Sequence, residues 1–275
     1  MKRISHSEKF TLSHKNVVVT GGAGILGKRF CFGYGEAGAN VAIVDIDYEK
    51  VRELAYELSN LYGIKAIGIK CDVSSPGEVN SMVKVVVEEL GSINVLHNNA
   101  ASKSANLEAF FETFEDYSLD EWRKVMSVNI DGMFLVAQAV GREMVRRKNG
   151  GSIIQMASIY GVVAPDQRIY EGSHYLGRQI NTPAVYAASK GAVISLTKYL
   201  AAYWGHRGIR VNTISPGGVE SGQNDIFKVN YSNRVPLGRM AKGDELVGVA
   251  IFLASEASSY ITGQNLVVDG GLSTW

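Results

Sequence analysis

The sequence predicts one α/β domain built on a doubly wound parallel sheet of about seven strands, with helices on both faces. Short apolar runs rich in Val and Ile alternate with longer runs of helical periodicity along most of the chain. A glycine-rich loop joins the first short run to the first helical run. The chain contains no repeat and no linker rich in Pro, Gly or Ser, so we expect residues 1–14 to be a lead-in and residues 15–275 to form a single domain.

The composition limits the possible partners of the protein. The chain has 275 residues, 46% of them hydrophobic, and its 28 basic and 27 acidic residues give a net charge of +1. Such a balance does not predict binding to nucleic acid or to an anionic membrane. The sequence predicts neither a signal peptide nor a membrane span, so we expect a cytoplasmic protein. Cys31 and Cys71 lie in apolar runs and are expected to be buried thiols.

The elements follow one another in a regular order. The short apolar runs predict strands at residues 16–20, 40–45, 65–71, 93–97, 151–158, 209–215 and 265–269. The other runs predict helices from the glycine loop to about residue 37 and at residues 47–62, 76–87, 118–148, 184–204 and 245–255. We expect Ser118 to cap the long helix, with Glu121 completing a capping box. Residues 219–243 are expected to be irregular and polar.

A candidate phosphate site follows the first strand, where Gly22, Gly24 and Gly27 lie between a strand and a helix. Glycines let the backbone approach a pyrophosphate, which then rests at the helix N-terminus. The alternative is a tight turn without a ligand. Asp45 ends the second strand, 18 positions after Gly27, where a carboxylate accepts hydrogen bonds from an adenosine ribose and repels a 2′-phosphate. NAD is therefore favoured over NADP. The alternative is that Asp45 is an ordinary loop residue that contacts no ligand.

Tyr186 and Lys190 are the candidate proton-transfer residues. They are four positions apart near the start of the helix predicted at residues 184–204, so they should lie on one face of it. A nearby ammonium favours the phenolate, and we expect Lys190 to lower the pKa of Tyr186 from its usual value of about 10. Such a phenol can donate and accept a proton near neutral pH. Alternatively, the pair is an ordinary tyrosine and lysine on a helix surface.

Two further positions favour a functional interpretation. Asn129 lies inside a predicted helix, although asparagine side chains compete for the backbone hydrogen bonds of a helix. Ser158 ends the fifth strand, at the edge where open α/β sheets bind ligands. Residues 102–118 contain a cluster of aromatic residues: Phe110, Phe111, Phe114 and Tyr117. We expect this cluster to pack the segment against the rest of the domain. Alternatively, it lines a pocket or forms a subunit contact.

Several separate motifs occur in a fixed order along residues 15–272. They are Thr20-Gly21-Gly22-Ala23-Gly24-Ile25-Leu26-Gly27, Cys71-Asp72-Val73, Asn98-Asn99-Ala100, Ser127-Val128-Asn129-Ile130, Ser158, Tyr186 with Lys190, Pro216-Gly217, and Gly263 through Gly271. In this order they resemble the classical short-chain dehydrogenase/reductase family, and the set is far more specific than any single motif. Within the family the chain resembles gluconate 5-dehydrogenase-like and flagellin sugar-modification members.

The resemblance implies a catalytic tetrad and a nicotinamide cofactor. Tyr186 would donate or accept the substrate proton, Lys190 would lower its pKa and hold the nicotinamide ribose, and Ser158 would hydrogen-bond the substrate oxygen. Asn129 would anchor a water that links Lys190 to solvent. The cofactor, NAD rather than NADP, would contact Gly21, Gly24, Ile25, Leu26, Gly27, Asp45, Ile46, Asp72, Val73, Asn98, Ala100, Tyr186, Lys190, Pro216, Gly217 and Val219. Members of the family are commonly tetramers, so we expect a homotetramer or homodimer.

The chain departs from the family's pattern in three places. Ile25 and Ala101 each stand where the family usually has a glycine, which bears on loop geometry more than on cofactor binding. The larger departure is the additional segment 164–182 between the serine and the tyrosine of the tetrad. With residues 102–118, it would lie on the substrate side of the cofactor.

The additional segment is expected to bind substrate, or equally to form a surface flap or a subunit contact. Candidate substrate residues are Ser158, Tyr160, Arg168, His174 and Arg178. The resulting hypothesis is an NAD-dependent oxidoreductase that acts on a secondary alcohol or ketone of a sugar, sugar acid or nucleotide sugar. The alternative is a catalytically inactive NAD-binding sensor or scaffold. No metal site is predicted.

Overall fold

A parallel β-sheet forms the centre of the structure, a computed structural model that describes residues 5–104 and 106–275. Within these residues seven strands lie in the order β3-β2-β1-β4-β5-β8-β9, and neighbours run parallel. They are β1 (Asn16–Thr20), β2 (Asn40–Asp45), β3 (Ala66–Lys70), β4 (Val95–Asn98), β5 (Gly151–Met156), β8 (Ile209–Pro216) and β9 (Asn265–Val268). The predicted fold class is confirmed. Residues 1–4 of the predicted lead-in and residue 105 of the segment 102–118 lie outside the described residues.

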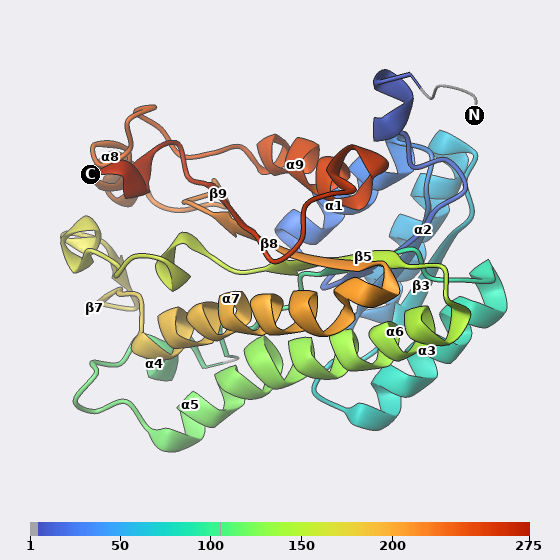
Figure 1. The fold of residues 1–275 in the computed structure, drawn as a ribbon. Helices are drawn as coiled ribbons and strands as arrows, with labels where there is room; N and C mark the ends of the chain where they lie inside the picture. Colours follow the sequence, from blue (N-terminus) through green and yellow to red (C-terminus); the bar gives the residue numbers. More distant parts are fainter. Residues whose placement is uncertain (1–4, 105) are drawn as a thin grey trace.

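Two layers of helices cover the sheet (Figure 1). One face carries α1 (Ile25–Glu36), α2 (Tyr48–Tyr62) and α9 (Val247–Ala254), and the other carries α3 (Pro76–Leu90), α6 (Met133–Arg147) and α7 (Ala184–Trp204). Because both faces are covered, every residue of β1 is buried, as its continuous β-branched run predicts.

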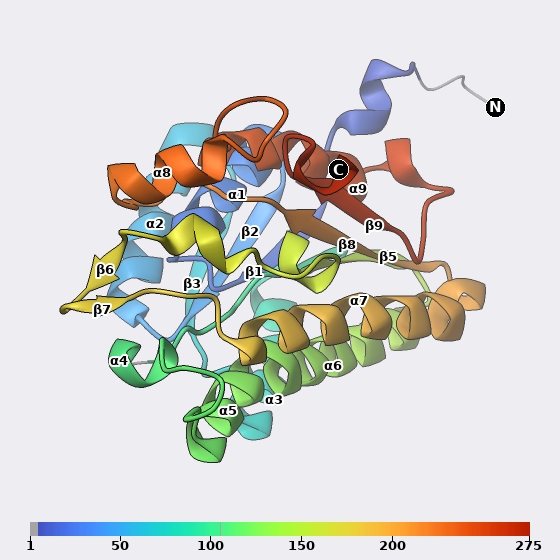
Figure 2. The same ribbon diagram turned by 90° about the vertical axis from the view of Figure 1, so that its left-hand side faces the viewer.

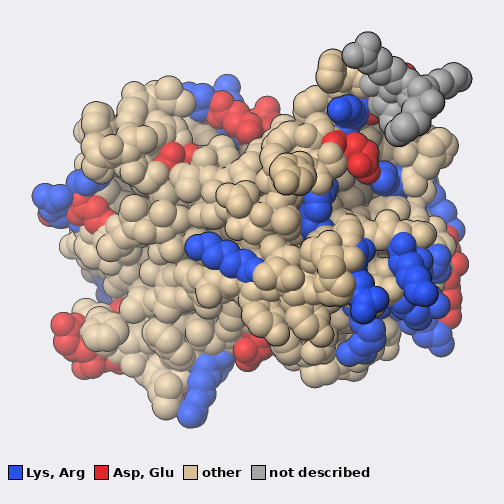
Figure 3. Space-filling model, in the orientation of Figure 1, with Lys and Arg blue, Asp and Glu red and all other residues tan. Residues whose placement is uncertain are grey.

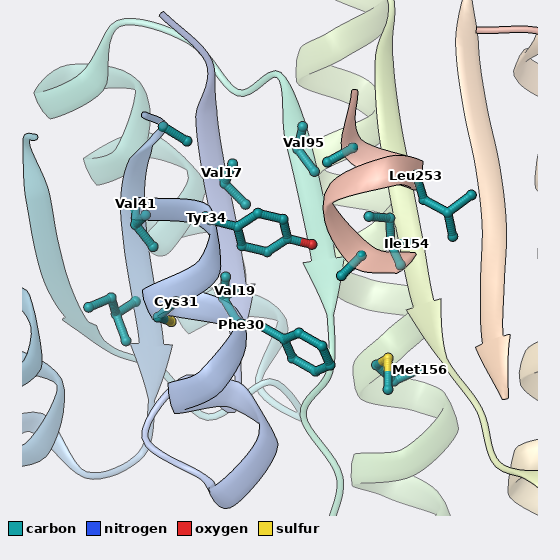
Figure 4. Packing of buried hydrophobic residues seen from close by; sticks show 14 of the residues in the cluster. Val17, Val19, Phe30, Cys31, Tyr34, Val41, Val95, Ile154, Met156 and Leu253 are labelled. Atoms are coloured by element: carbon teal, nitrogen blue, oxygen red, sulfur yellow. The ribbon is translucent and has the colours of Figure 1, made fainter. Parts of the chain in front are cut away.

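The side chains of β1 alternate between two hydrophobic clusters, one on each face of the sheet. Val17 and Val19 pack with Phe30 and Tyr34 of α1 (Figure 4), whereas Val18 packs in the cluster on the opposite face. This alternation follows from the two-residue period of a strand. Burying each such side chain contributes about 1.5–3 kcal/mol, so the central strands anchor both helix layers.

The strand order places a crevice at the carboxyl edge of the sheet. β1 lies between β2 and β4. The chain therefore runs outward from β1 through β2 to β3, and then crosses to the other side of β1 to form β4 and the remaining strands of the sheet. Open α/β sheets bind ligands at such a switch point, outside the carboxyl ends of their strands. Because all neighbouring strands are parallel, the loops after them meet at this one edge.

The helix predicted at residues 118–148 is interrupted. α5 (Leu119–Met126) and α6 are joined by a π-helical turn at Ser127–Gly132, so the chain is helical throughout as predicted, but it is not α-helical in the middle. Ser118 caps α5 as predicted, because its hydroxyl accepts a hydrogen bond from the backbone N–H of Glu121 at 3.2 Å. The Glu121 carboxylate forms an ion pair with Lys124 at 3.5 Å instead of completing the predicted capping box.

Two less regular segments lie together at the carboxyl edge. Residues 164–182, which we call the strap, contain a 3₁₀ turn (Gln167–Tyr170) and a hairpin of β6 (His174–Tyr175) and β7 (Arg178–Gln179). The strap passes between α8 (Asp225–Ser232) and α4 (Leu107–Phe110), as Figure 2 shows. The prediction that residues 219–243 are irregular was wrong at α8, because the Asn224 side chain caps a helix there by accepting from the backbone N–H of Phe227 at 2.8 Å.

Charges of both signs lie around the rim of the molecule, and the middle of the face over α7 is mostly uncharged, with one basic side chain lying across it (Figure 3). In the part of the chain that the structure describes, no helix is both long and apolar enough to cross a membrane.

Cys31 and Cys71 are buried free thiols, as predicted. Burial raises the pKa of Cys71 to about 12, so this thiol is unreactive near neutral pH.

Candidate active site

The sequence-predicted cofactor residues gather at the carboxyl edge of the sheet. They lie at the ends of β1, β2, β3, β4 and β8 or in the loops that follow: Gly21 and Gly24 to Gly27, Asp45 and Ile46, Asp72 and Val73, Asn98 and Ala100, and Pro216, Gly217 and Val219. Ser158 follows β5, and Tyr186 lies in the first turn of α7. The fold therefore brings residues that are far apart in the sequence to one site.

The glycine loop has the backbone shape that a phosphate site requires. Gly21 has a φ of +63°, which residues with a side chain rarely adopt. A Cβ atom at Gly27 would lie 2.0 Å from the carbonyl oxygen of Gly21, so only glycine lets α1 start this close to the loop. Gly24 is the N-cap of α1, and among the described residues no side chain caps that helix. Its first N–H groups therefore remain available to an anion, which fits the pyrophosphate of a dinucleotide.

Asp45 lies beside the glycine loop. Its carboxylate accepts a hydrogen bond from the backbone N–H of Ala23 at 3.1 Å, which holds the end of β2 against the loop. Ile25 and Ile46 are 61% and 67% exposed at the same edge. A fixed carboxylate with exposed apolar neighbours fits an adenosine, which presents ribose hydroxyls and an apolar base.

Two predicted cofactor side chains have structural partners of their own. The Asp72 carboxylate accepts hydrogen bonds from the backbone N–H and the hydroxyl of Ser74, at 2.9 and 2.7 Å. Asn98 is buried, and its side chain accepts from the Thr20 hydroxyl at 3.1 Å and donates to the carbonyl of Met133 at 2.9 Å. The Asn98 side chain therefore joins β1, β4 and α6.

Tyr186 and Ser158 lie on the wall of a cavity of about 350 Å³. Lys190 lies one turn further along α7 and is only 3% exposed. Its ammonium nitrogen is 5.8 Å from the centre of the Tyr186 ring and donates a hydrogen bond to the carbonyl of Met156 at 3.0 Å. Tyr186 and Lys190 thus lie near each other, as their spacing predicts.

Burial dominates the ionisation of this pair. It lowers the pKa of Lys190 to about 8, because the ammonium form loses its hydration. It also raises the pKa of Tyr186 above its usual value of 10, while a hydrogen bond with Ser158 acts in the opposite direction. The net shift at Tyr186 is therefore opposite to the predicted lowering, because desolvation disfavours both the phenolate and the ammonium that would stabilise it.

Asn129 lies fully buried in the π-helical turn. Its side-chain oxygen accepts a hydrogen bond from the backbone N–H of Ser102 at 2.7 Å, and its amide nitrogen donates to the Ser189 hydroxyl at 3.5 Å. Ser189 donates in turn to the carbonyl of Tyr186 at 2.8 Å. π-helical turns are rare in proteins, but those that occur are frequently found at functional sites. This turn connects the loop after β4 to the helix that carries Tyr186.

The remaining cavity wall is aromatic and hydroxyl-rich. Tyr160, one of the candidate substrate residues, lines it. Phe110 and Phe111 also line the cavity, which was one of the alternatives for the aromatic cluster of residues 102–118. The sequence did not identify several other wall residues in the segments 102–118, 164–182 and 219–243: Lys103, Tyr170, Ile180, Asn181, Thr182, Gln223, Phe227 and Tyr231. The sequence identified the first two segments as substrate-side, but irregular segments carry no periodicity that shows which side chains point inward.

The three basic substrate candidates of the strap lie outside this wall. Arg168 forms an ion pair with Asp166 at 2.8 Å, and Arg178 forms one with Glu112 at 2.9 Å. His174 is exposed in β6. The Arg178 side chain thus joins the strap to the segment 102–118, whereas the ion pair of Arg168 lies within the strap.

The comparisons with known proteins agree with this arrangement. A family model described as enoyl-(acyl carrier protein) reductase matches residues 26–273. D-threitol dehydrogenase from Mycolicibacterium smegmatis is 36% identical, over 95% of this chain and 94% of that protein. A gluconate 5-dehydrogenase from Burkholderia cenocepacia J2315, solved in complex with NADP and tartrate, is 34% identical over 97% of this chain and 98% of that one, with a TM-score of 0.85.

A third relative was solved with the other nicotinamide cofactor. It is a short chain dehydrogenase from Leptospira borgpetersenii with bound NAD+. It is 34% identical over 99% of this chain and 97% of that one, with a TM-score of 0.82. These relatives cover 95–99% of the present chain.

Proposed function

Because the chain belongs to the short-chain dehydrogenase/reductase family, we propose that it interconverts a secondary alcohol and a ketone in a polyol, sugar, sugar acid or nucleotide sugar. The observation that carries the proposal is the cavity wall, where the hydroxyls of Tyr186 and Ser158 lie together and Lys190 is buried behind them. A bound nicotinamide supplies the acceptor or donor of the hydride.

Each residue of the tetrad has a role in this proposal. The Tyr186 hydroxyl accepts the proton of the alcohol or returns it to the carbonyl oxygen, and Ser158 hydrogen-bonds the same oxygen. Lys190, with a pKa of about 8, carries a positive charge at neutral pH and so favours the phenolate of Tyr186 when it forms. Asn129 holds the loop after β4 against α7 and thereby positions both residues.

We propose NAD as the preferred cofactor. The support is the Asp45 carboxylate, which is fixed against the glycine loop and would repel the 2′-phosphate of NADP. The solved relatives include one protein with NADP and one with NAD+, so membership of the family does not decide this choice. Both cofactors therefore belong in the first assay.

The substrate class rests on the cavity and on the relatives. Aromatic faces can cover the C–H side of a carbon chain, and hydroxyls at their edges can bind its oxygens. Exposed Lys103 also lines the cavity and suits a substrate that carries a carboxylate, as a sugar acid does. The relatives named for D-threitol and gluconate represent a neutral and an acidic member of this class.

The test is the change of nicotinamide absorbance with NAD and with NADP against polyols, sugars, sugar acids and nucleotide sugars. We expect turnover of at least one of these classes, with NAD preferred. Tyr186→Phe should lower turnover by at least about 100-fold while NAD binding, followed by fluorescence, stays intact. Tyr56→Phe, on the exposed side of α2, is the control and should behave as wild type. Cofactor binding without turnover of any substrate would instead favour a sensor or scaffold.

We also propose a homo-oligomer that assembles through α7. Tyr199 and Tyr203 are 63% and 58% exposed on this helix, with their rings stacked 5.8 Å apart, and the surrounding face carries few charges (Figure 3). Sedimentation equilibrium should give a multiple of 29.8 kDa for wild type and a smaller mass for Tyr199→Lys with Tyr203→Lys. A wild-type mass of one chain would contradict the proposal.

A further inference from the structure

The inner face of the strap presents two hydroxyls to the cavity. Tyr170 and Thr182 are 8% and 9% exposed, both line the cavity, and their hydroxyl groups are hydrogen-bonded to each other. Tyr160 lies on the same wall, and its hydroxyl is near enough to that of Tyr170 for each residue to affect the pKa of the other. The three residues therefore lie together on one wall of the cavity, and we call them the hydroxyl row.

The protein holds the hydroxyl row from behind. The ring of Tyr170 stacks on Phe227 of α8, with 5.3 Å between the ring centres and 25° between the planes. The Gln167 side chain binds the backbone of Thr182 twice, donating to its carbonyl at 3.0 Å and accepting from its N–H at 3.3 Å. Rigid support of this kind is what a binding group needs in order to favour one position of a ligand.

The hydroxyl row is connected to the catalytic end of the cavity. The backbone N–H of Tyr160 donates to the hydroxyl of Ser158 at 3.2 Å. Thr182 lies four positions before Tyr186 and lines the same cavity. A substrate whose reacting carbon lies at Ser158 and Tyr186 therefore has the rest of its carbon chain in the cavity that the hydroxyl row lines.

The hydrogen-bond count shows what the row can bind. Three hydroxyls carry three O–H donors, and the hydrogen bond between Tyr170 and Thr182 uses one of these donors. Two O–H groups and several lone pairs remain, so the row can both donate to and accept from a further hydroxyl. A substrate that brings an alkyl group to this place leaves a buried donor without a partner, which is unfavourable.

We propose that Tyr160, Tyr170 and Thr182 determine specificity by binding a substrate hydroxyl away from the reacting carbon. The hydroxyl row thus selects polyhydroxylated substrates over those that carry an alkyl chain at that position. This inference rests on the proposed function, because it concerns the substrate of the same reaction. It assigns a role to the strap, whose inner side chains rather than its outer cations face the substrate.

The experiment compares matched substrates in wild type, Tyr170→Phe and Thr182→Val. One pair is D-threitol and butane-2,3-diol of the same configuration, and the other is D-gluconate and its 6-deoxy analogue. We expect wild type to prefer the hydroxylated member of a pair in kcat/KM, and each variant to reduce that preference about tenfold, mainly through KM. Tyr175→Phe, in the strap but outside the cavity wall, is the control and should keep the preference.

The possible results separate the two proposals. A preference that is the same in wild type and both variants, or a loss that is equal for both members of a pair, would overturn the role of the hydroxyl row alone. Absence of turnover of D-threitol and D-gluconate by wild type would contradict the choice of substrate class on which the row depends. Thermal unfolding of each variant identifies a fold defect, and Thr182→Val changes so little volume that it keeps the test valid if Tyr170→Phe is unstable.

Discussion

Tyr186 and Lys190 are each driven toward the uncharged form by burial. A residue with a pKa near the working pH can change charge at little cost, and the pKa of Lys190 is about 8. Because the ammonium nitrogen lies 5.8 Å from the centre of the Tyr186 ring, the charged lysine favours the phenolate, and the phenolate favours the charged lysine. The pH dependence of the enzyme therefore reports on both residues together.

We predict that Lys190 makes stability rise with pH between about 8 and 10.5. In this range the folded protein, in which the pKa of Lys190 is about 8, has lost the proton, whereas the unfolded chain, with the usual value of 10.5, keeps it. The unfolded state binds more protons, so folding becomes more favourable as the pH rises, by up to about 3 kcal/mol. Urea unfolding should show this rise in the free-energy difference between wild type and Lys190→Met.

Lys198→Met is the matched control, because Lys198 lies on the exposed side of the same helix. The difference between wild type and this variant should stay constant over the same pH range. A constant difference for Lys190→Met as well would mean that Lys190 keeps its proton in the folded protein, and the role given to its burial would be incorrect.

The residues that the sequence identified correctly as neighbours are those whose signal is local. Tyr186 and Lys190 are one helical turn apart, and Ser158 directly follows a strand whose direction is fixed by its apolar run. Tyr170 and Thr182 could not be paired in this way, because they are 12 positions apart in a segment without periodicity. Their contact depends on the conformation of the whole strap.

Helices, too, were predicted correctly where their signal in the sequence is local and strong. α2 is amphipathic, with an Asp47 N-cap and a C-terminal Gly63 in the left-handed conformation, and its prediction was accurate. α8 was missed because it is short and its surroundings are polar, although Asn224 followed by Phe227 and Tyr231 is a usable cap-and-face signal. The π-helical turn left one trace in the sequence, the unusual position of Asn129, and that trace does not specify the type of helix.

The strap connects α8 with the segment 102–118, and neither of these regions belongs to the sheet. On one side the Asn230 side chain of α8 donates to the carbonyls of Ile169 and Glu171, at 3.3 and 3.1 Å. On the other side the Asn181 side chain of the strap donates to the carbonyl of Phe111 at 2.8 Å. Figure 2 shows the strap between these two regions. The part of the cavity wall formed by residues 102–118, the strap and residues 219–243 is therefore one continuous surface.

We predict that Asn230→Ala and Asn181→Ala each loosen the whole strap while the sheet keeps its stability. Each change removes hydrogen bonds worth on the order of 1 kcal/mol, so amide hydrogen exchange in residues 168–182 should become about tenfold faster. Exchange in β1 and β4 should not change, because the strap makes no part of their pairing. Asn233→Ala, at an exposed position just after α8, is the control and should leave the strap protected. If Asn230→Ala affected only its own side and residues 178–182 kept their protection, the strap would consist of two independent loops.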